Sequence, residues 1–390
     1  MQLLPVALLL GALAAPTASE SFNPLKHLAG IAPYRTINDP PLESAPPQGC
    51  NVTKAAYLIR HAAIYANDFD YESYLEPFVE KLRNTTQDWS KTTDLKFLAN
   101  WTAPVDGEHL EKVTKVGYKE AVELGVNFRT RYASLPHPSK VWSSSADRTT
   151  KTAAGFIEGY TLNKTAGMDL VEVKEKKDTG VDSLTPYKSC PAYRVNQEWV
   201  EKYTAPIKER LNAQAPNFNF TTSDIVSMFE FCGYETVIRG DSPFCATTLF
   251  PRMTGSPSNT VRISGTSITW ALGLFNNSAF SGTDNVNKTM PTDKINYGRQ
   301  WKSSDILPFL TNIAIERLSC DSYGYDEGDY YRVLVNSSPQ PLEDCRGGPG
   351  DSCSATKFGD FVKGLGERFG DFVGACGAPK NESQVVTIYN

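Results

Sequence analysis

The sequence contains little histidine and no excess of basic charge, and both shortages limit its possible functions. It has four histidines in 390 residues and no C-x-x-C pair, so the ligand spacing of a zinc site is missing. Its formal net charge of −5 excludes a broad basic face for nucleic acid or an anionic membrane. It also lacks a Gly-rich nucleotide loop. We expect no metal, no organic cofactor, and a small-molecule ligand held in a local pocket.

Long apolar runs are also missing, with one exception at the N-terminus. Residues 1–19, MQLLPVALLLGALAAPTAS, are a short apolar run with a small-residue ending, which is typical of a cleaved secretory signal and too short for a membrane span. A buried core helix is the alternative. Residues 20–49 contain two Pro-Pro pairs and are predicted to form an irregular N-terminal arm.

Cysteines and glycosylation sequons both indicate export. The eight cysteines all follow the predicted signal, and an even set in an exported chain favours disulfides. These are Cys50, Cys190, Cys232, Cys245, Cys320, Cys345, Cys353 and Cys376. N-x-S/T sequons begin at Asn51, Asn84, Asn100, Asn163, Asn219, Asn276, Asn287, Asn336 and Asn381. This density predicts a glycosylated, secreted extracellular protein.

The hydrophobic pattern alternates between strand-length and helical segments. AAYLIRH and KVWSS have strand length, whereas LEKVTKVGYKEAVELGVNF and FGDFVKGLGERFGDF have helical spacing. This alternation predicts an α/β fold in residues 50–390, with a mostly parallel central sheet flanked by helices. Residues 68–135 and 195–255 are assigned to a smaller, reduced helical cap.

The strand YLIRH ends at Arg60-His61, which places both side chains at the carboxyl edge of a sheet, where α/β folds bind ligands. An arginine fork suits a tetrahedral oxyanion, and a neutral imidazole beside it could attack phosphorus. A single histidine at a strand end is more often structural. The other histidines (His27, His109 and His137) receive that structural assignment.

A second candidate lies in VWSSSADRTTKTAAGF, where a strand leads into a helix through Asp147 and Arg148. A helix N-terminus offers free N–H groups and the positive end of the helix dipole, which favours anions. Taken alone, Arg148 could equally be a solvated arginine beside Asp147.

Together, YLIRH, SSSADRTTKTAAGFIEGY, ALGLFNNS, ILPFLTNIAIERLSC and YYRVLVNSSPQPLEDC resemble the histidine acid phosphatase family, in the phytase-like branch of the histidine phosphatase superfamily. The resemblance covers most of the chain after the signal and implies a phosphoglycerate mutase-like fold. By similarity, His61 is the nucleophile that becomes phosphohistidine, and Arg60 and Arg148 hold phosphate. The implied disulfides are Cys50–Cys320, Cys190–Cys376, Cys232–Cys245 and Cys345–Cys353.

The sequence departs from the family pattern at four site positions. Ala62 replaces the glycine after the histidine, and Ile64 replaces a second motif arginine. Counting back without gaps from the ALGLF helix places Val261 on a pocket histidine and Arg262 on the general acid. Valine cannot hydrogen-bond, and arginine stays protonated, so neither can take over these roles. The stretch before Val261 is also shorter than in phytase-like members.

Three functions remain open. The first is a phosphomonoesterase working through His61, weakened by the missing acid, with Asp68, Asp70 or Glu72 as possible substitutes. The second is a catalytically inactive glycoprotein that binds phosphate or another anion. The third is a tailoring enzyme for a small organic substrate, since aliphatic Ile64 and Val261 would suit a less charged ligand. The retained arginines and histidine favour the first.

Overall fold

The computed structural model describes residues 23–35, 42–162, 167–173, 198–250, 303–342 and 344–377. Several sequence predictions fall outside these ranges: the signal at residues 1–19, Cys190, Val261, Arg262, and the sequons at Asn163, Asn276, Asn287 and Asn381. Within the described ranges, no helix is long and apolar enough to cross a membrane.

The larger sheet is antiparallel. Its strands are β1 (Cys50–Ile59), β4 (Asn312–Cys320), β5 (Gly328–Val335), β6 (Ser338–Gln340) and β7 (Cys353–Ser354), in the order β1-β4-β5-β6, with β7 also pairing with β5. Only β2 (Lys140–Ser144) and β3 (Asp169–Val173), among the described strands, pair in parallel. The α/β class is confirmed, but the predicted mostly parallel direction is wrong for these strands. The short β4–β5 and β5–β6 connections can join only antiparallel neighbours.

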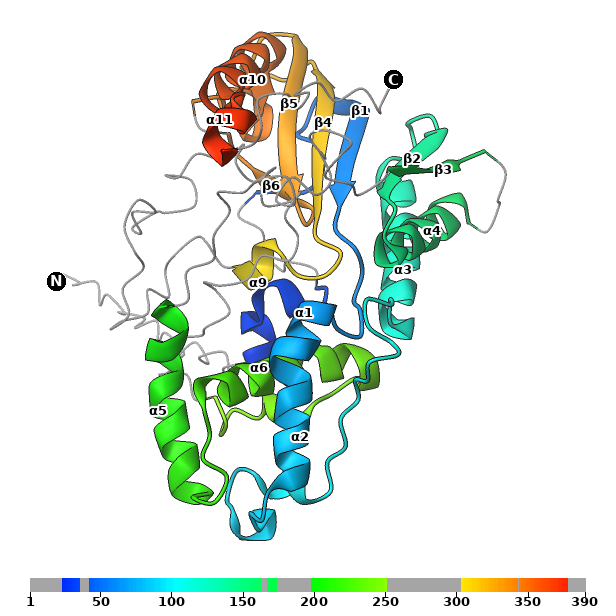
Figure 1. Ribbon diagram of the computed structural model, residues 1–390. Helices are drawn as coiled ribbons and strands as arrows, with labels where there is room; N and C mark the ends of the chain where they lie inside the picture. The colour runs from blue at the N-terminus through cyan, green and yellow to red at the C-terminus, as the bar shows by residue number, and fades with distance from the viewer. Residues whose placement is uncertain are drawn as a thin grey trace, which may run out of the picture.

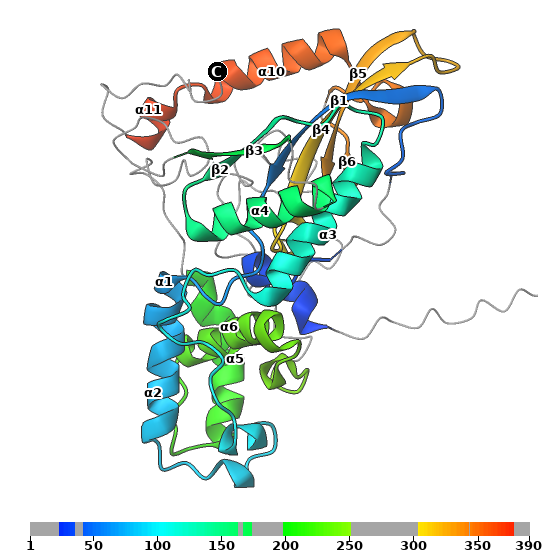
Figure 2. The ribbon, with the colours of Figure 1, turned by 90° about the vertical axis from the view of Figure 1, so that its right-hand side faces the viewer.

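Helices cover both faces of this sheet (Figure 1, Figure 2). On one face α10 (Ala355–Phe369) packs through Phe358 and Phe361, in a cluster that includes Leu58 of β1. On the other face, α3 (Lys115–Arg131) and α4 (Asp147–Thr161) share a cluster with Tyr57 and Ile59. The alternation of β1 side chains between the two clusters follows the period of a strand.

A separate helical layer lies beyond the end of the sheet (Figure 2). It contains α1 (Asp68–Asp70), η3 (Tyr71–Leu75), α2 (Glu76–Asn84), η4 (Trp89–Lys91), η5 (Lys96–Ala99), α5 (Glu198–Gln214), α6 (Thr222–Arg239) and η8 (Pro243–Cys245). Its core is rich in aromatic side chains, including Phe78, Phe231 and Phe244. Helix α3, which the sequence prediction placed in the cap, packs instead against α4 and β1.

Part of the predicted N-terminal arm is ordered against α9 and against α6 of the helical layer. It forms the short turns η1 (Pro24–His27) and η2 (Ala29–Ile31), and the intervening Leu28 is buried. The N–H of Ala29 donates to Ser304 Oγ at 2.7 Å, in α9 (Ser303–Ile306). The arm therefore packs beside the segment that precedes β4.

The remaining short elements are η11 (Pro349–Asp351) and α11 (Phe372–Cys376).

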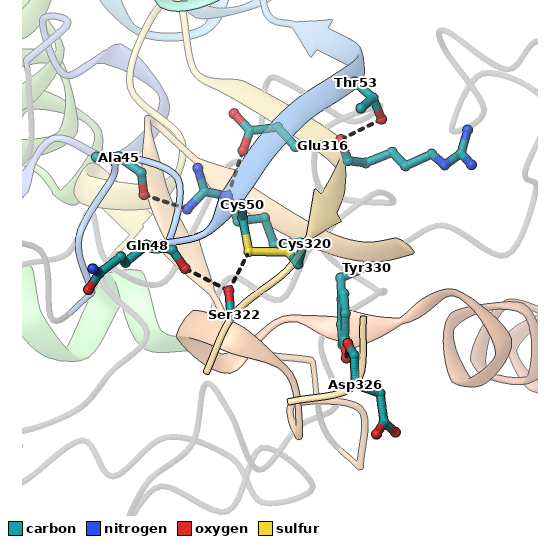
Figure 3. Close-up of a disulfide and its surroundings, with 11 residues drawn as sticks. Ala45, Gln48, Cys50, Thr53, Glu316, Cys320, Ser322, Asp326 and Tyr330 are labelled. Carbon is teal, nitrogen blue, oxygen red and sulfur yellow. Dashed lines mark hydrogen bonds and ion pairs between the residues drawn. A yellow bond between two sulfur atoms is a disulfide. The ribbon is translucent and has the colours of Figure 1, made fainter. Parts of the chain in front are cut away.

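Three of the four implied disulfides are confirmed. Cys50–Cys320 joins the first residue of β1 to the last residue of β4, which face each other in the ladder (Figure 3). Cys232–Cys245 joins the middle of α6 to the last residue of η8, and Cys345–Cys353 closes a loop beside β7. The fourth pairing stays a prediction because Cys190 is outside the described residues.

One predicted glycosylation site is wrong. Asn336 is 3% exposed and lies with Ser337 in the β5–β6 turn, where both residues have positive φ, as a type I′ hairpin turn requires. Its Oδ1 accepts from the N–H of Asn312 at 3.0 Å, and its Nδ2 donates to the carbonyl of Asp305 at 2.7 Å. The nitrogen that a glycan would modify is therefore buried and bonded. The exposed sequons Asn51, Asn84, Asn100 and Asn219 stay predictions.

Candidate active site

The Arg60-His61 pair lies where β1 ends and β4 begins. The N–H of Arg60 donates to the carbonyl of Thr311 at 2.8 Å, and the N–H of Leu310 donates to the carbonyl of His61 at 3.2 Å. These two bonds tie the residues after β1 to the loop before β4. The predicted position at the carboxyl edge of a strand is observed, although the neighbouring strand is antiparallel.

The Arg60 side chain is buried and held by backbone oxygens. Its Nη1 donates to the carbonyls of Gly30 at 2.5 Å and Leu307 at 2.8 Å. Its guanidinium carbon lies 5.0 Å from the centroid of the Phe309 ring. Burial lowers the pKa of Arg60 to about 9, the Arg148 charge adds to the lowering, and Tyr234 opposes it. The N-terminal arm, through Gly30, thus positions this arginine.

His61 has a defined tautomer. Its Nδ1 lies 2.9 Å from the carbonyl oxygen of Ala62, which can only accept, so Nδ1 carries the proton and Nε2 carries the lone pair. Burial, followed by the positive charges of Arg60 and Arg148, holds the pKa of His61 well below its ordinary value. The imidazole is therefore neutral, and nucleophilic at Nε2, in mildly acidic solution.

Arg148 lies in the first turn of α4 and forms an ion pair with Glu111. The neighbouring turn of the helix is joined to the His61 loop: Thr152 Oγ1 donates to the carbonyl of Arg148 at 2.6 Å and accepts from the N–H of Ala62 at 2.9 Å. The Thr152 hydroxyl therefore connects the segment after His61 to the first turn of α4, which carries Arg148. The structure brings Arg60, His61 and Arg148 together, as the sequence predicted.

Two of the substituted positions belong to the core. Ala62 is fully buried under Thr152, and Ile64 is 3% exposed. Ile64 forms an isolated antiparallel bridge with Val113 and packs in the aromatic-rich core of the helical layer. It therefore fills apolar space, and the expectation that Ile64 makes the ligand pocket less polar is wrong.

The predicted substitute acids differ in their surroundings. Asp70 is buried, and its Oδ2 accepts from the Tyr234 hydroxyl at 2.7 Å and from Asn67 Nδ2 at 2.6 Å. Burial, followed by the charges of Asp70 and Glu230, raises the pKa of Tyr234 well above its ordinary value. Asp68 is exposed, and its negative charge acts on Glu111.

Four residues near the site were missed by the sequence analysis: Glu111, Thr152, Tyr234 and Phe309. Thr152 and Phe309 lie in segments that resemble the family, but no pattern in the sequence marked any of the four, since each reaches the site through tertiary packing. Among the other histidines, His109 Nδ1 lies 2.7 Å from Asp106 Oδ1. The described residues contain no group of three or more His, Cys, Asp or Glu side chains placed to hold a metal ion.

The fold and this site define an α/β protein in which two arginines surround a neutral, oriented histidine, a set suited to a tetrahedral oxyanion. The family model of the histidine phosphatase superfamily (branch 2) matches residues 51–250. The chain belongs to this family.

Curated relatives align over nearly the whole chain. The acid phosphatase PHO1 of Komagataella pastoris is 29% identical, with 93% of this chain and 88% of the relative covered. The phytase PHO112 of Candida albicans is 28% identical, with 95% and 90% covered.

Solved structures agree on the fold. The phytase from D. castellii matches with a TM-score of 0.76 at 23% identity, covering 97% of this chain and 93% of that one. The multiple inositol polyphosphate phosphatase of Bifidobacterium longum, in complex with inositol hexasulfate, matches with a TM-score of 0.56 at 12% identity, covering 86% and 97%. At these identities the likeness extends to the fold alone.

Proposed function

We propose that this protein is a secreted acid phosphatase that hydrolyses phosphomonoesters through a phosphohistidine on His61. The observation that carries the proposal is the contact of His61 Nδ1 with the Ala62 carbonyl, which leaves Nε2 as the nucleophile. In the proposed reaction, Nε2 attacks phosphorus, the bond from phosphorus to the ester oxygen breaks, and water later cleaves the P–N bond.

Arg60 and Arg148 hold the phosphate in this scheme. Both positive charges act on His61 and lower its pKa, which means that the site has a positive potential where the dianion would bind. A phosphate group would compensate this potential, and two guanidinium groups would stabilise the charge on the equatorial oxygens in the transition state. The curated relatives named as acid phosphatase and phytase support the same reaction class.

We further propose that catalysis is weakened. Counted without gaps, the family pocket histidine and general acid fall on Val261 and Arg262, and loss of a general acid typically removes roughly 10²–10⁴-fold of rate. Esters with good leaving groups would be least affected, because their leaving oxygen needs no proton. An inactive phosphate-binding glycoprotein is the second function, and the retained arginines are compatible with it. The tailoring-enzyme alternative has lost its support from Ile64, which lies in the core.

The deciding experiment compares wild type with His61→Ala and with the matched control His137→Ala, which alters an exposed histidine away from the site. Release of p-nitrophenol from its phosphate ester is followed across the acidic pH range, and phosphate binding is measured by calorimetry. Activity that disappears only in His61→Ala supports the phosphatase. Phosphate binding without hydrolysis in wild type would establish the binding protein instead. Equal turnover in wild type and His61→Ala would contradict the proposal.

Secretion has its own test. Residues 1–19 predict a signal, and the three described disulfides suit an oxidising compartment. Expression in a secreting host, followed by N-terminal sequencing of the protein in the medium, should give a mature chain that begins near residue 20. Retention of Met1 on an intracellular protein would contradict this part of the proposal.

A further inference from the structure

Glu111 is held rigidly beside the proposed phosphate site. The segment that carries it pairs with the chain just after His61: the N–H of Thr114 donates to the carbonyl of Ala63 at 2.9 Å, and the N–H of Tyr65 donates to the carbonyl of Lys112 at 3.0 Å. The N–H of Glu111 itself donates to the carbonyl of Ala66 at 2.7 Å. These bonds fix the Glu111 backbone in a left-handed conformation, with φ of 64°. Its carboxyl group is therefore placed by the same loop that carries His61.

Two charged groups face the Glu111 carboxyl group from two different elements. Arg148 of α4 donates from Nη1 to Oε2, and the negative charge of Asp68 of α1 acts on the same carboxyl group. The side chain of Glu111 is 30% exposed, so it is neither sealed in the core nor fully solvated. Burial raises the pKa of Glu111, the Arg148 charge opposes this, and the Asp68 charge adds to it. Burial and the Asp68 charge therefore favour the protonated form of Glu111.

We propose that Glu111 is the proton donor to the leaving oxygen in the reaction of His61, a role that rests on the proposed phosphatase function. A phosphate oxygen bound by Arg148 lies beside the carboxyl group that Arg148 already contacts. Arg148 occupies Oε2, and the transferable proton resides on Oε1. Glu111 would thus supply the chemistry that Arg262 cannot.

The reaction balances in two steps. In the first, the Nε2 lone pair of His61 forms a bond to phosphorus, the bond from phosphorus to the ester oxygen breaks, and Glu111 gives its proton to that oxygen, releasing the alcohol. In the second, the Glu111 carboxylate takes a proton from water as its oxygen attacks phosphorus and the P–N bond breaks. Inorganic phosphate leaves, and both His61 and Glu111 return to their starting protonation states.

The predicted substitutes fit this role less well. The Oδ2 oxygen of the Asp70 carboxyl group accepts from the Tyr234 hydroxyl and from Asn67 Nδ2, so this oxygen is engaged within the helical layer. Asp68 is exposed, and its charge acts on Glu111. Glu72 is exposed on η3. Glu111 forms an ion pair with Arg148, which is a proposed phosphate-binding arginine.

The test exploits the leaving group. Wild type, Glu111→Gln, Glu111→Asp, the control Glu108→Gln and His61→Ala are assayed with p-nitrophenyl phosphate and with glycerol 2-phosphate. Glu108 is exposed on the same loop, so its change controls for loss of a nearby negative charge. Aspartate suits the left-handed backbone at this position, so Glu111→Asp tests whether a carboxyl group restores activity if glutamine perturbs the fold.

We expect Glu111→Gln to lose roughly 10²–10⁴-fold of kcat with glycerol 2-phosphate, but less than about tenfold with p-nitrophenyl phosphate, whose leaving group needs no proton. The fall of glycerol 2-phosphate hydrolysis with rising pH should disappear in this variant, and Glu111→Asp should recover part of the rate. Equal losses with both substrates, or no loss in Glu111→Gln, would overturn the role of Glu111. Full activity in His61→Ala would instead overturn the phosphatase function itself.

Discussion

Two groups of arginines, one around Glu316 and one beside His61, differ in how their positive charge is compensated and in the direction of the pKa shifts. Around Glu316 of β4, Arg332 Nε of β5 donates to Oε2 at 2.5 Å, and Arg131 Nε of α3 donates to Oε1 at 3.0 Å. The Tyr132 hydroxyl adds a bond to Oε1 at 2.7 Å, so the fully buried carboxylate is shared by three donors. Burial lowers the pKa of Arg131, but Glu316 and Tyr132 more than compensate, and the pKa is raised.

At the site the balance is reversed. Arg60 donates to the backbone carbonyls of Gly30 and Leu307, and its pKa is lowered to about 9 by burial and by Arg148. The same two arginines lower the pKa of His61. At Glu316 a fully buried carboxylate neutralises two arginines, and the group is structural. At the site Arg60 donates to backbone carbonyls and Arg148 pairs with the partly exposed Glu111, yet both arginines still lower the pKa of His61, so an anionic ligand would complete the arrangement.

The largest expected effect comes from removing the shared carboxylate. Glu316→Gln keeps the shape of the side chain but leaves Arg332 and Arg131 without a buried negative partner. Breaking such a pair on one side is expected to lower the free energy of unfolding by about 3–5 kcal/mol. Urea unfolding followed by circular dichroism measures this change. A loss below about 1 kcal/mol would mean that water or relaxation compensates the two arginines.

The corresponding change at the site should affect activity rather than stability. Arg148→Gln removes one proposed phosphate donor and should lower kcat/KM for p-nitrophenyl phosphate by about 10²–10³-fold. The ion pair with Glu111 is partly exposed on both sides, so we expect its loss to change stability by about 0–1 kcal/mol. Lys151→Gln, an exposed change one turn along α4, is the control. A large loss of stability with unchanged kcat/KM would show that Arg148 is structural, as the arginines around Glu316 are, and does not serve activity.

The pH profile sharpens the same comparison. Attack requires a neutral His61, so kcat/KM should fall as pH decreases through the pKa of His61, which lies well below 6.5. Arg148→Gln removes a positive charge that lowers this pKa, so the acid limb, meaning the fall of kcat/KM at low pH, should move to higher pH. Lys151→Gln should leave the position of this acid limb unchanged. A limb that stays fixed, or moves to lower pH, in Arg148→Gln would show that Arg148 does not act on His61.

The sequence predicted the parts of this molecule that depend on local pattern. A strand ending at Arg60-His61 and a helix beginning at Arg148 could be found because their hydrophobic spacing changes at those residues. The pairing of cysteines followed from resemblance to a family, and three pairs are confirmed. Strand direction could not be read in this way, because β4 lies beside β1 only through an association of segments far apart in the chain.

The missed residues share a physical reason. Glu111 contacts Arg148 because an isolated bridge aligns its loop with the chain after His61, and no spacing in the sequence encodes that bridge. The sequon at Asn336 has the required triplet, yet both atoms of its side-chain amide are already hydrogen-bonded in the folded protein. Motifs specify residue types, whereas burial and partners are decided by the packed structure.

The smallest expected effect provides the matched control for Glu316. Arg317 and Asp329 also form an ion pair between β4 and β5, but both side chains are about one-third exposed. The ion pair raises the pKa of Arg317, yet solvent screens the interaction, and the freed arginine can be hydrated. Asp329→Asn should therefore leave the urea midpoint unchanged within error, while Glu316→Gln, one residue away from Arg317 on the same strand, lowers it strongly. Equal shifts in the two variants would show that charge on this ladder matters regardless of burial.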